Sequence, residues 1–159
     1  VVGPQYPRGL GWPRNVRRIQ HLPPDRHCGF YTSQRFTLNI TRAAMVRAGW
    51  SPSVRLFEAA ACATPIISDH WTGIESFFTP GREILIARRS AQTLAYLRDI
   101  PEEERRQIGS LARERVLGSH TAAHRAAELE AYALEALARP ARATAAHGAS
   151  ASAAVVATT

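Results

Sequence analysis

A helix that runs directly into a buried strand is the feature that most constrains the fold of this chain. Residues 51–69 read SPSVRLFEAAACATPIISD. Ser51 before Pro52 predicts a helix start, because Ser is a favoured N-cap and Pro fits the first helical position. We expect this helix to end near Cys62 and the β-branched run at 64–69 to form a buried strand. Open parallel sheets are built from such units, so a ligand crevice is expected at the carboxyl ends of the strands.

The rest of the chain alternates between strand and helix patterns in the same way. The expected strands lie at residues 15–22, 36–41, 64–69 and 82–87, and the opening Val-Val pair is interpreted as the end of another. Further helices are expected from Pro24 and Asp25, in TGIESFF, and in three segments that fill 91–100, 101–117 and 119–138, whereas 42–50 is expected to be irregular. The pattern predicts an α/β fold: a parallel sheet flanked by helices, with a helical C-terminal end.

The amino-acid composition changes near the C-terminus, where bulky apolar residues become rare. We assign residues 1–138 to one domain, and 139–159, which are rich in Ala, Ser and Thr, to a disordered tail that cannot bury enough apolar surface to order itself. The first residues contain neither a signal peptide nor an initiating Met. We interpret the chain as a piece of a longer protein.

The composition indicates which kinds of partner and which cellular compartment to expect. The net charge of +7 comes entirely from Arg, since the 159 residues include no Lys, and it suits a phosphate-bearing partner. The Arg residues are scattered among acids without a nucleic-acid-binding motif, so a phosphorylated small molecule is favoured over nucleic acid. No apolar run approaches the ~20 residues of a membrane span. Cys28 and Cys62 belong to no metal-binding pattern and are expected to be reduced thiols in a cytoplasmic protein.

The helix that begins at Ser51 carries the first candidate binding residues. Its first-turn amides are unpaired and its dipole is positive there, so a phosphate can dock at SPSV, with Arg55 adding a charge-assisted hydrogen bond. Arg55, Glu58 and Cys62 share one helix face. The Glu58 carboxylate can accept hydrogen bonds from a vicinal diol such as that of a ribose. The alternative is an exposed ion pair between Arg55 and Glu58.

Other candidates are better explained by structure than by chemistry. His120, His124 and Glu128 have a spacing that can hold a metal, but Thr121 stands where metalloproteases have Glu, so we expect no metal site. A satisfied structural role is preferred for His21 and His27, with entry into a cleft as the alternative. Core or cleft-edge packing is preferred for Trp12, Trp50 and Trp71, although these side chains could stack on a base or sugar. Asp69 is interpreted either as an N-cap or as a cleft residue.

The segment from Leu38 to Ala87 resembles the donor-binding half of a GT-B glycosyltransferase. The wider group 1 family has a segment PS…EA-x-A-C-G-T-P-[VI]-I before a strand and a GG-I-x-E turn after it, and this chain has SPSVRLFEAAACATPII and WTGIES. The segments PGREILIA and RVLGSHTAAHRA further resemble the CgeB-like branch, named for spore maturation proteins. The resemblance covers about residues 1–135.

This resemblance implies a Rossmann-like domain that binds a nucleotide-sugar as substrate and uses no other cofactor. By position, Glu58 matches the Glu that holds the ribose hydroxyls, and Arg55, with the amides near Ser53, matches the diphosphate site. The remaining residues implied to line the donor cleft are Asn39, Thr41, Arg42, Gly73, Ile74 and Glu75. For the first three the alternative is strand-end capping, and for Glu75 it is a first-turn acid favoured by the helix dipole.

The chain departs from the family pattern in three respects. Trp50 replaces a second Glu that many members carry eight residues before the Glu that matches Glu58, and Ala63 replaces a Gly at the tight turn into the strand, where it adds a Cβ. The acceptor-binding half that would precede this segment is absent, so this piece alone is expected to be inactive. The alternative to a glycosyltransferase domain is a non-catalytic module that binds a nucleotide or a partner. A dinucleotide-dependent oxidoreductase is disfavoured because no strand is followed by GxGxxG.

Overall fold

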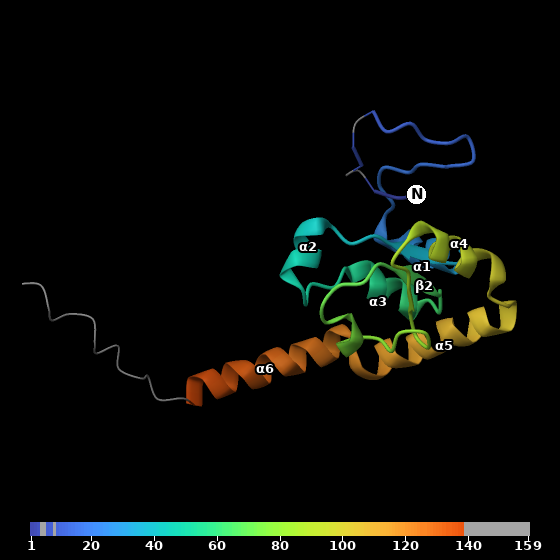
Figure 1. Cartoon of the computed structure of the whole chain (residues 1–159). Coiled ribbons are helices and arrows are strands. Elements are labelled where there is room, and N and C mark those ends of the chain that lie inside the picture. The colour runs from blue at the N-terminus through green and yellow to red at the C-terminus, as the bar shows by residue number, and fades with distance from the viewer. Residues whose placement is uncertain (4–5, 8, 139–159) are drawn as a thin grey trace, which may run out of the picture. The chain divides into compact units, whose positions relative to one another are not determined.

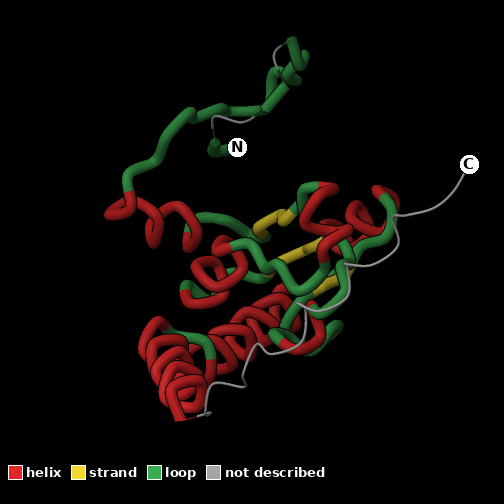
Figure 2. The backbone as a smooth tube through the Cα atoms, turned by 90° about the vertical axis from the view of Figure 1, so that its left-hand side faces the viewer, coloured by secondary structure: helices red, strands yellow, loops and turns green. Residues whose placement is uncertain are grey.

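The computed structural model describes residues 1–3, 6–7 and 9–138, in two units that divide between Thr121 and Ala122. The first unit has the predicted α/β fold, a Rossmann-like parallel sheet flanked by helices (Figures 1 and 2). Its strands, in sheet order, are β1 (Thr37–Asn39), β2 (Ile66–Ser68) and β3 (Leu85–Ile86). Its helices are η1 (Pro24–Arg26), α1 (His27–Thr32), α2 (Ala43–Ala48), α3 (Val54–Ala61), η2 (Ile74–Ser76), α4 (Ser90–Asp99) and α5 (Glu102–Ser119).

The two faces of the sheet pack in two separate hydrophobic clusters, and α5 contributes to both. Alternate strand residues point to opposite faces, so Ile66 and Ile67 enter different cores. Ile66 packs in a cluster with residues of α1, α3 and α5, including the fully buried Leu56. Ile67 packs in the other cluster, against which Tyr96 and Leu97 of α4 also pack. Burial on both faces explains why the segment that contains β2 reads as a continuous apolar run.

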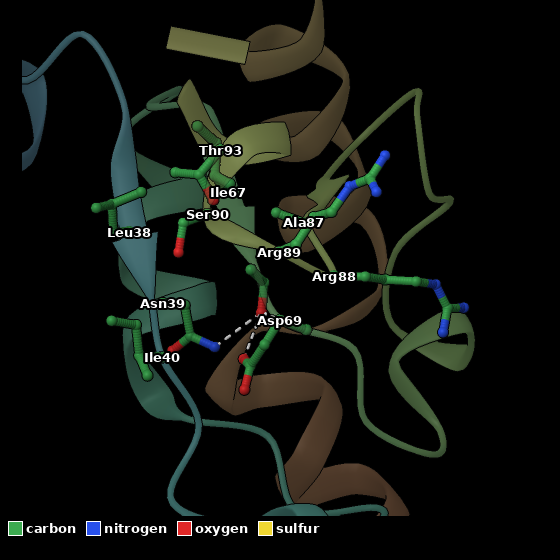
Figure 3. A pocket seen from close by; sticks show the side chains of 11 residues that line it. Leu38, Asn39, Ile40, Ile67, Asp69, Ala87, Arg88, Arg89, Ser90 and Thr93 are labelled. Carbon is green, nitrogen blue, oxygen red and sulfur yellow. Dashed lines mark hydrogen bonds between the residues drawn. The ribbon is translucent and has the colours of Figure 1, made fainter. Parts of the chain in front are cut away.

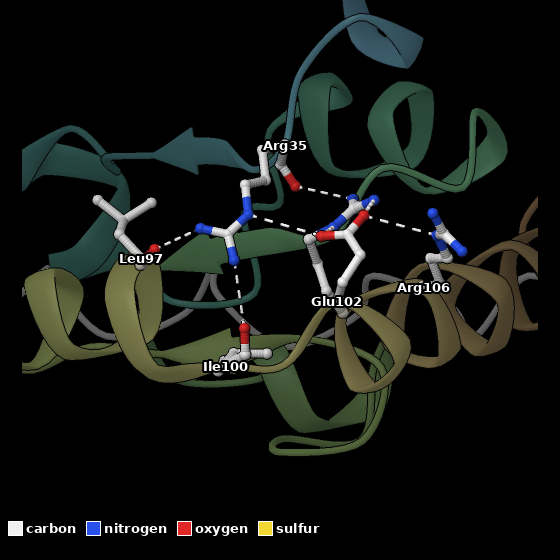
Figure 4. Close-up of polar contacts among 6 residues, drawn as sticks. Arg35, Leu97, Ile100, Glu102 and Arg106 are labelled. Atoms are coloured by element: carbon white, nitrogen blue, oxygen red, sulfur yellow. Dashed lines mark hydrogen bonds and ion pairs between the residues drawn. The ribbon is translucent and has the colours of Figure 1, made fainter.

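Charged residues link the segment before β1 to the start of α5 through hydrogen bonds and ion pairs. The Arg35 guanidinium donates hydrogen bonds to the carbonyls of Leu97 and Ile100 (Figure 4). Glu102, in the first turn of α5, pairs with Arg35 and Arg105, and these contacts lower the pKa of Glu102 to about 2, chiefly through the Arg105 hydrogen bond. Three successive acids, Glu102 to Glu104, also favour a helix start at this point because they face the positive end of the helix dipole.

The turn between α3 and β2 is unusually close to α5. Ala63 in this turn has a φ of 53°, a left-handed conformation that favours glycine. Gly109 of α5 packs against it, and a Cβ built on Gly109 would lie 2.2 Å from the Ala63 carbonyl oxygen. Ala63 therefore adopts the left-handed conformation at the position where the family pattern has Gly, and Gly109 allows the helix to approach this turn.

Several element boundaries differ from those predicted. The helix predicted to start after Ser51 begins at Val54 with Ser53 as its N-cap. The prediction was wrong because the preceding loop is held elsewhere: the Trp50 N–H donates to the Thr72 carbonyl at 2.7 Å. The end of α3, with Cys62 as C-cap, agrees with the prediction.

Two further predictions about local structure were wrong. The segment 42–50, expected to be irregular, contains α2, a helix of six residues that ends at Gly49, whose φ is 64°. Residues 15–22, expected to be a strand, contribute within the described region only an isolated parallel bridge between Ile19 and Val2. Short elements such as these carry too few residues for a periodic pattern to identify them.

The second unit, taken by itself, consists in its described part of α6 (Ala122–Ala138). This helix agrees with the predicted helical C-terminal end. The tail predicted for 139–159 lies outside the described residues.

Candidate functional site

Asn39 and Ser68 end two neighbouring parallel strands and lie side by side in register. Both side chains are almost completely buried. The Asn39 amide donates through Nδ2 to Ser68 Oγ at 2.9 Å and to Thr41 Oγ1 at 3.3 Å. Buried polar groups destabilise a protein unless they are hydrogen-bonded, and here each side chain satisfies the other. The carboxyl edge of the sheet therefore carries an ordered polar pair.

Arg55 and Asp69 complete this polar network, one from α3 and one from the end of β2. Arg55 Nη1 donates to Asn39 Oδ1 at 3.0 Å. The Asp69 carboxylate accepts from the Thr41 N–H at 3.1 Å and from Thr41 Oγ1 at 2.7 Å. Asp69 therefore holds the loop after β1 instead of capping a helix.

A pocket of about 230 Å³ opens beside the network, at the carboxyl ends of all three strands (Figure 3). It is lined by Leu38, Asn39, Ile40, Ile67, Ser68, Asp69, Ala87, Arg88, Arg89, Ser90 and Thr93. Leu38 and Ile40 form an exposed apolar wall along β1. The first turn of α4 forms another wall and lacks a side-chain N-cap. In Figure 3 the Arg88 and Arg89 side chains extend away from Leu38 and Ile40. The pocket thus combines apolar surface with helix amides and a positive rim.

Glu58 is oriented by residues of α1. Its two carboxylate oxygens accept from Tyr31 Oη at 3.0 Å and from His27 Nδ1 at 3.2 Å. His27 Nε2 also lies 3.1 Å from the Leu22 carbonyl oxygen, so both ring nitrogens face acceptors, and the ring donates to both only when it is protonated. The Leu22 carbonyl and then the Glu58 hydrogen bond raise the pKa of His27. Burial, followed by the Glu58 hydrogen bond, raises the pKa of Tyr31.

The turn after β2 packs against the loop after β1. Gly73 has a φ of 100°, and a Cβ built on it would lie 2.6 Å from the Trp50 ring, so this position requires glycine. The Ile74 side chain is fully buried in the core and leaves only its backbone for a ligand. Glu75 contacts His70 Nε2 at 3.0 Å, and its own backbone N–H, then the His70 hydrogen bond, lower the pKa of Glu75.

The structure brings together only some of the predicted site residues. Asn39, Thr41 and Arg55 meet in one network. Arg42 is the N-cap residue of α2 and Ser53 that of α3. Glu58 lies in a separate hydrogen-bonded group, and Gly73, Ile74 and Glu75 form the turn that supports Trp50. Throughout the described ranges, no three His, Cys, Asp or Glu side chains gather in a way that could hold a metal ion.

Sequence reasoning missed Ser68 and the start of α4. Ser68 is the polar residue at the end of an apolar strand, and this position was the signal that could have identified it; its register beside Asn39 is visible only in the structure. Arg88, Arg89 and Ser90 follow β3, in the same way that Thr41 and Arg42 follow β1. Polar residues in the last positions of each predicted strand, or directly after it, would therefore have located this edge.

An open parallel sheet with polar side chains gathered at its carboxyl edge is typical of α/β domains that bind a ligand there. A family model described as glycosyl transferase-like matches residues 1–131. The chain therefore belongs to this glycosyl transferase-like family, whose general role is glycosyl transfer. Comparisons with curated proteins and with solved structures gave no match. Within the part of the chain that the structure describes, no helix is long and apolar enough to cross a membrane.

Proposed function

We propose that this chain is the donor-binding half of a GT-B glycosyltransferase of the CgeB-like branch of group 1, which transfers a sugar from a nucleotide-sugar. The observation that carries the proposal is the position of Arg55 at the carboxyl edge of the sheet. Its side chain is half-buried, and among the described residues its only hydrogen-bond partner is Asn39. Most of its N–H donors are therefore open to an anionic ligand.

The leaving group in such a transfer is a nucleoside diphosphate, on which negative charge develops as the glycosidic bond breaks. An arginine held in place before the reaction stabilises this charge without reorganising at the moment of transfer. The first turn of α3 supports the same role, because no side chain caps its amides and its dipole is positive there. Arg42 and Thr41, which end the loop before α2, would line the other side of the diphosphate.

Glu58 is proposed to bind the ribose hydroxyls. Each of its oxygens already accepts one hydrogen bond, from Tyr31 or His27, which fixes the carboxylate and leaves further lone pairs for a diol. The turn at Gly73 to Glu75 would face the donor sugar. A second α/β half would supply the acceptor site, so the proposed catalytic unit is this domain together with that partner.

The experiment is thermal unfolding of the chain with UDP, GDP, ADP and dTDP and with their common sugar conjugates. A ligand at 100 times its Kd raises the free energy of unfolding by about 2.7 kcal/mol, which shifts the midpoint measurably. The variants are Arg55→Gln and, as a matched control, Arg82→Gln. Arg82 is an exposed arginine that precedes β3, at the opposite edge of the sheet, so both variants lose the same charge.

A midpoint shift with one nucleotide, lost in Arg55→Gln and kept in Arg82→Gln, would support the proposal. A shift of equal size in both variants would refute the assigned diphosphate site. If no nucleotide changed the midpoint of a chain that unfolds cooperatively, the donor-binding role itself would be wrong.

A further inference from the structure

Cys28 and Cys62 lie at the contact between α1 and α3, although they are far apart in sequence. Three hydrogen bonds define this contact: Tyr31 and His27 of α1 with Glu58 of α3, and Thr64 Oγ1 with the Tyr31 carbonyl at 2.8 Å. The α1 residues 27–31 therefore lie alongside the segment 58–64. One cysteine falls inside each of these two segments.

The two thiols lie in different surroundings on the two sides of this α1–α3 contact. Cys62 is the C-cap residue of α3 and packs, half-buried, against the core. Cys28 is exposed in the first turn of α1, and both are free cysteines. Burial raises the pKa of the Cys62 thiol, and the next contribution is a side-chain hydrogen bond with Cys28. The two side chains thus differ in exposure and lie on adjoining segments that three hydrogen bonds hold together.

We propose that Cys28 and Cys62 form a reversible disulfide bond that joins α1 to α3 when the protein meets a peroxide oxidant. The exposed Cys28 thiolate attacks one peroxide oxygen; the S–O bond forms as the O–O bond breaks, the other oxygen leaves as hydroxide and is protonated to water, and Cys28 becomes a sulfenic acid. The Cys62 sulfur then attacks the Cys28 sulfur, the S–S bond forms, and the sulfenic oxygen leaves as a second water. The two thiols lose two electrons and two protons, and the peroxide is reduced to water.

The bond would close the chain from residue 28 to residue 62 into a covalent loop. This loop contains β1, α2 and the Arg55 end of α3, and therefore much of the candidate site. Oxidation would fix the contact between His27, Tyr31 and Glu58, whereas reduction would leave it to hydrogen bonds alone. The proposal depends on the two thiols and not on the identity of the ligand.

The test uses the full chain, treated at low concentration with hydrogen peroxide, alkylated and digested with trypsin without reduction. Cleavage after Arg26, Arg35, Arg55 and Arg82 gives the peptides 27–35 and 56–82, each with one cysteine. We expect these two peptides to be joined, about 2 Da lighter than their sum because two hydrogens are lost, and to separate on adding dithiothreitol. Cys28→Ser and Cys62→Ser, each with an unchanged far-ultraviolet circular dichroism spectrum, should give no joined product.

The result that would overturn the proposal is separate alkylated peptides, or peptide 27–35 carrying sulfinic acid while Cys62 stays free. Peptide 27–35 joined to a second copy of itself would also overturn it, because that bond links two chains. A variant that fails to fold does not decide the matter, since the wild-type digest alone distinguishes these products.

Discussion

The two glycines of α5 are predicted to respond in opposite directions to the same substitution. Gly→Ala in the interior of a helix normally stabilises a protein by up to about 1 kcal/mol, because alanine has the higher helix propensity. Gly118 has open space where its Cβ would be added, but it lies in the last turn of α5, so Gly118→Ala should raise the free energy of unfolding by less than the interior value, about 0.5 kcal/mol. Gly109 faces the turn before β2, and its added Cβ would lie 2.2 Å from the Ala63 carbonyl oxygen and 3.2 Å from Pro65 Cδ.

Gly109→Ala should therefore destabilise the protein. The atoms that the new methyl group meets first belong to the backbone, which cannot turn away as a flexible side chain can. Relieving the contact requires α5 to move from α3, which opens a core that includes the fully buried Ala112. Overpacking of this kind costs about 1–3 kcal/mol, and the gain in helix propensity offsets part of it, so we expect a net loss of about 1–2 kcal/mol.

The assay is urea unfolding of the wild type and both variants, followed by circular dichroism at 222 nm. The reasoning requires Gly109→Ala to lower the midpoint and Gly118→Ala to raise it, with similar slopes. If Gly109→Ala were as stable as the wild type, the close approach of α5 to the Ala63 turn would be refuted.

Two further predictions concern ionisable groups. The pKa of His27 is raised in the folded state, so its stabilising contribution is fully present below the unfolded value near 6.5 and is lost as pH rises through the folded value. The thermal midpoint of the wild type should exceed that of His27→Gln most at about pH 5.5, and a difference that stayed constant to about pH 8.5 would contradict the assigned hydrogen bonds. Glu83 is buried and accepts from the Thr79 N–H at 2.7 Å and from Arg115 Nε at 3.1 Å. Arg115→Ala should lower the free energy of unfolding by about 1–3 kcal/mol, less than for a fully buried pair because Arg115 is partly exposed, and adding Glu83→Gln should recover part of the loss in urea unfolding.

The regular part of the fold was predictable because its elements are long or strongly apolar. The strand at Ile66 and the helix at Glu102 follow from a β-branched run and from acids at a helix start. The start of α3 was not predictable, because it depends on the Trp50 N–H bonding to Thr72 in a distant loop. The short helix α2 was not predictable either, because the helix propensity of six residues is too weak to stabilise a helix without tertiary contacts.

The candidate site was predictable where it follows from topology. Asn39 and Arg55 meet because one ends a parallel strand and the other lies in the first turn of the next long helix. The partners of Glu58 were not predictable, because they come from α1, whose docking on α3 depends on tertiary packing. The proximity of Cys28 and Cys62 was not predictable for the same reason, because nothing in their sequence separation indicates it.

The hydrogen bond between Arg55 and Asn39 also limits the direction from which a ligand can approach. Nη1 is committed to Asn39 Oδ1, and Asn39 is buried with its Nδ2 bonded to Ser68 and Thr41. If Arg55 swung away, it would leave that amide oxygen unpaired, at a cost of about 1–3 kcal/mol. The planar guanidinium is therefore held in one orientation. Within the described residues, the Nε–H and Nη2–H groups along its other edge donate to no protein acceptor. That edge offers two parallel N–H groups, which match two oxygens on one phosphorus or carbon atom and discriminate against a single hydroxyl or halide.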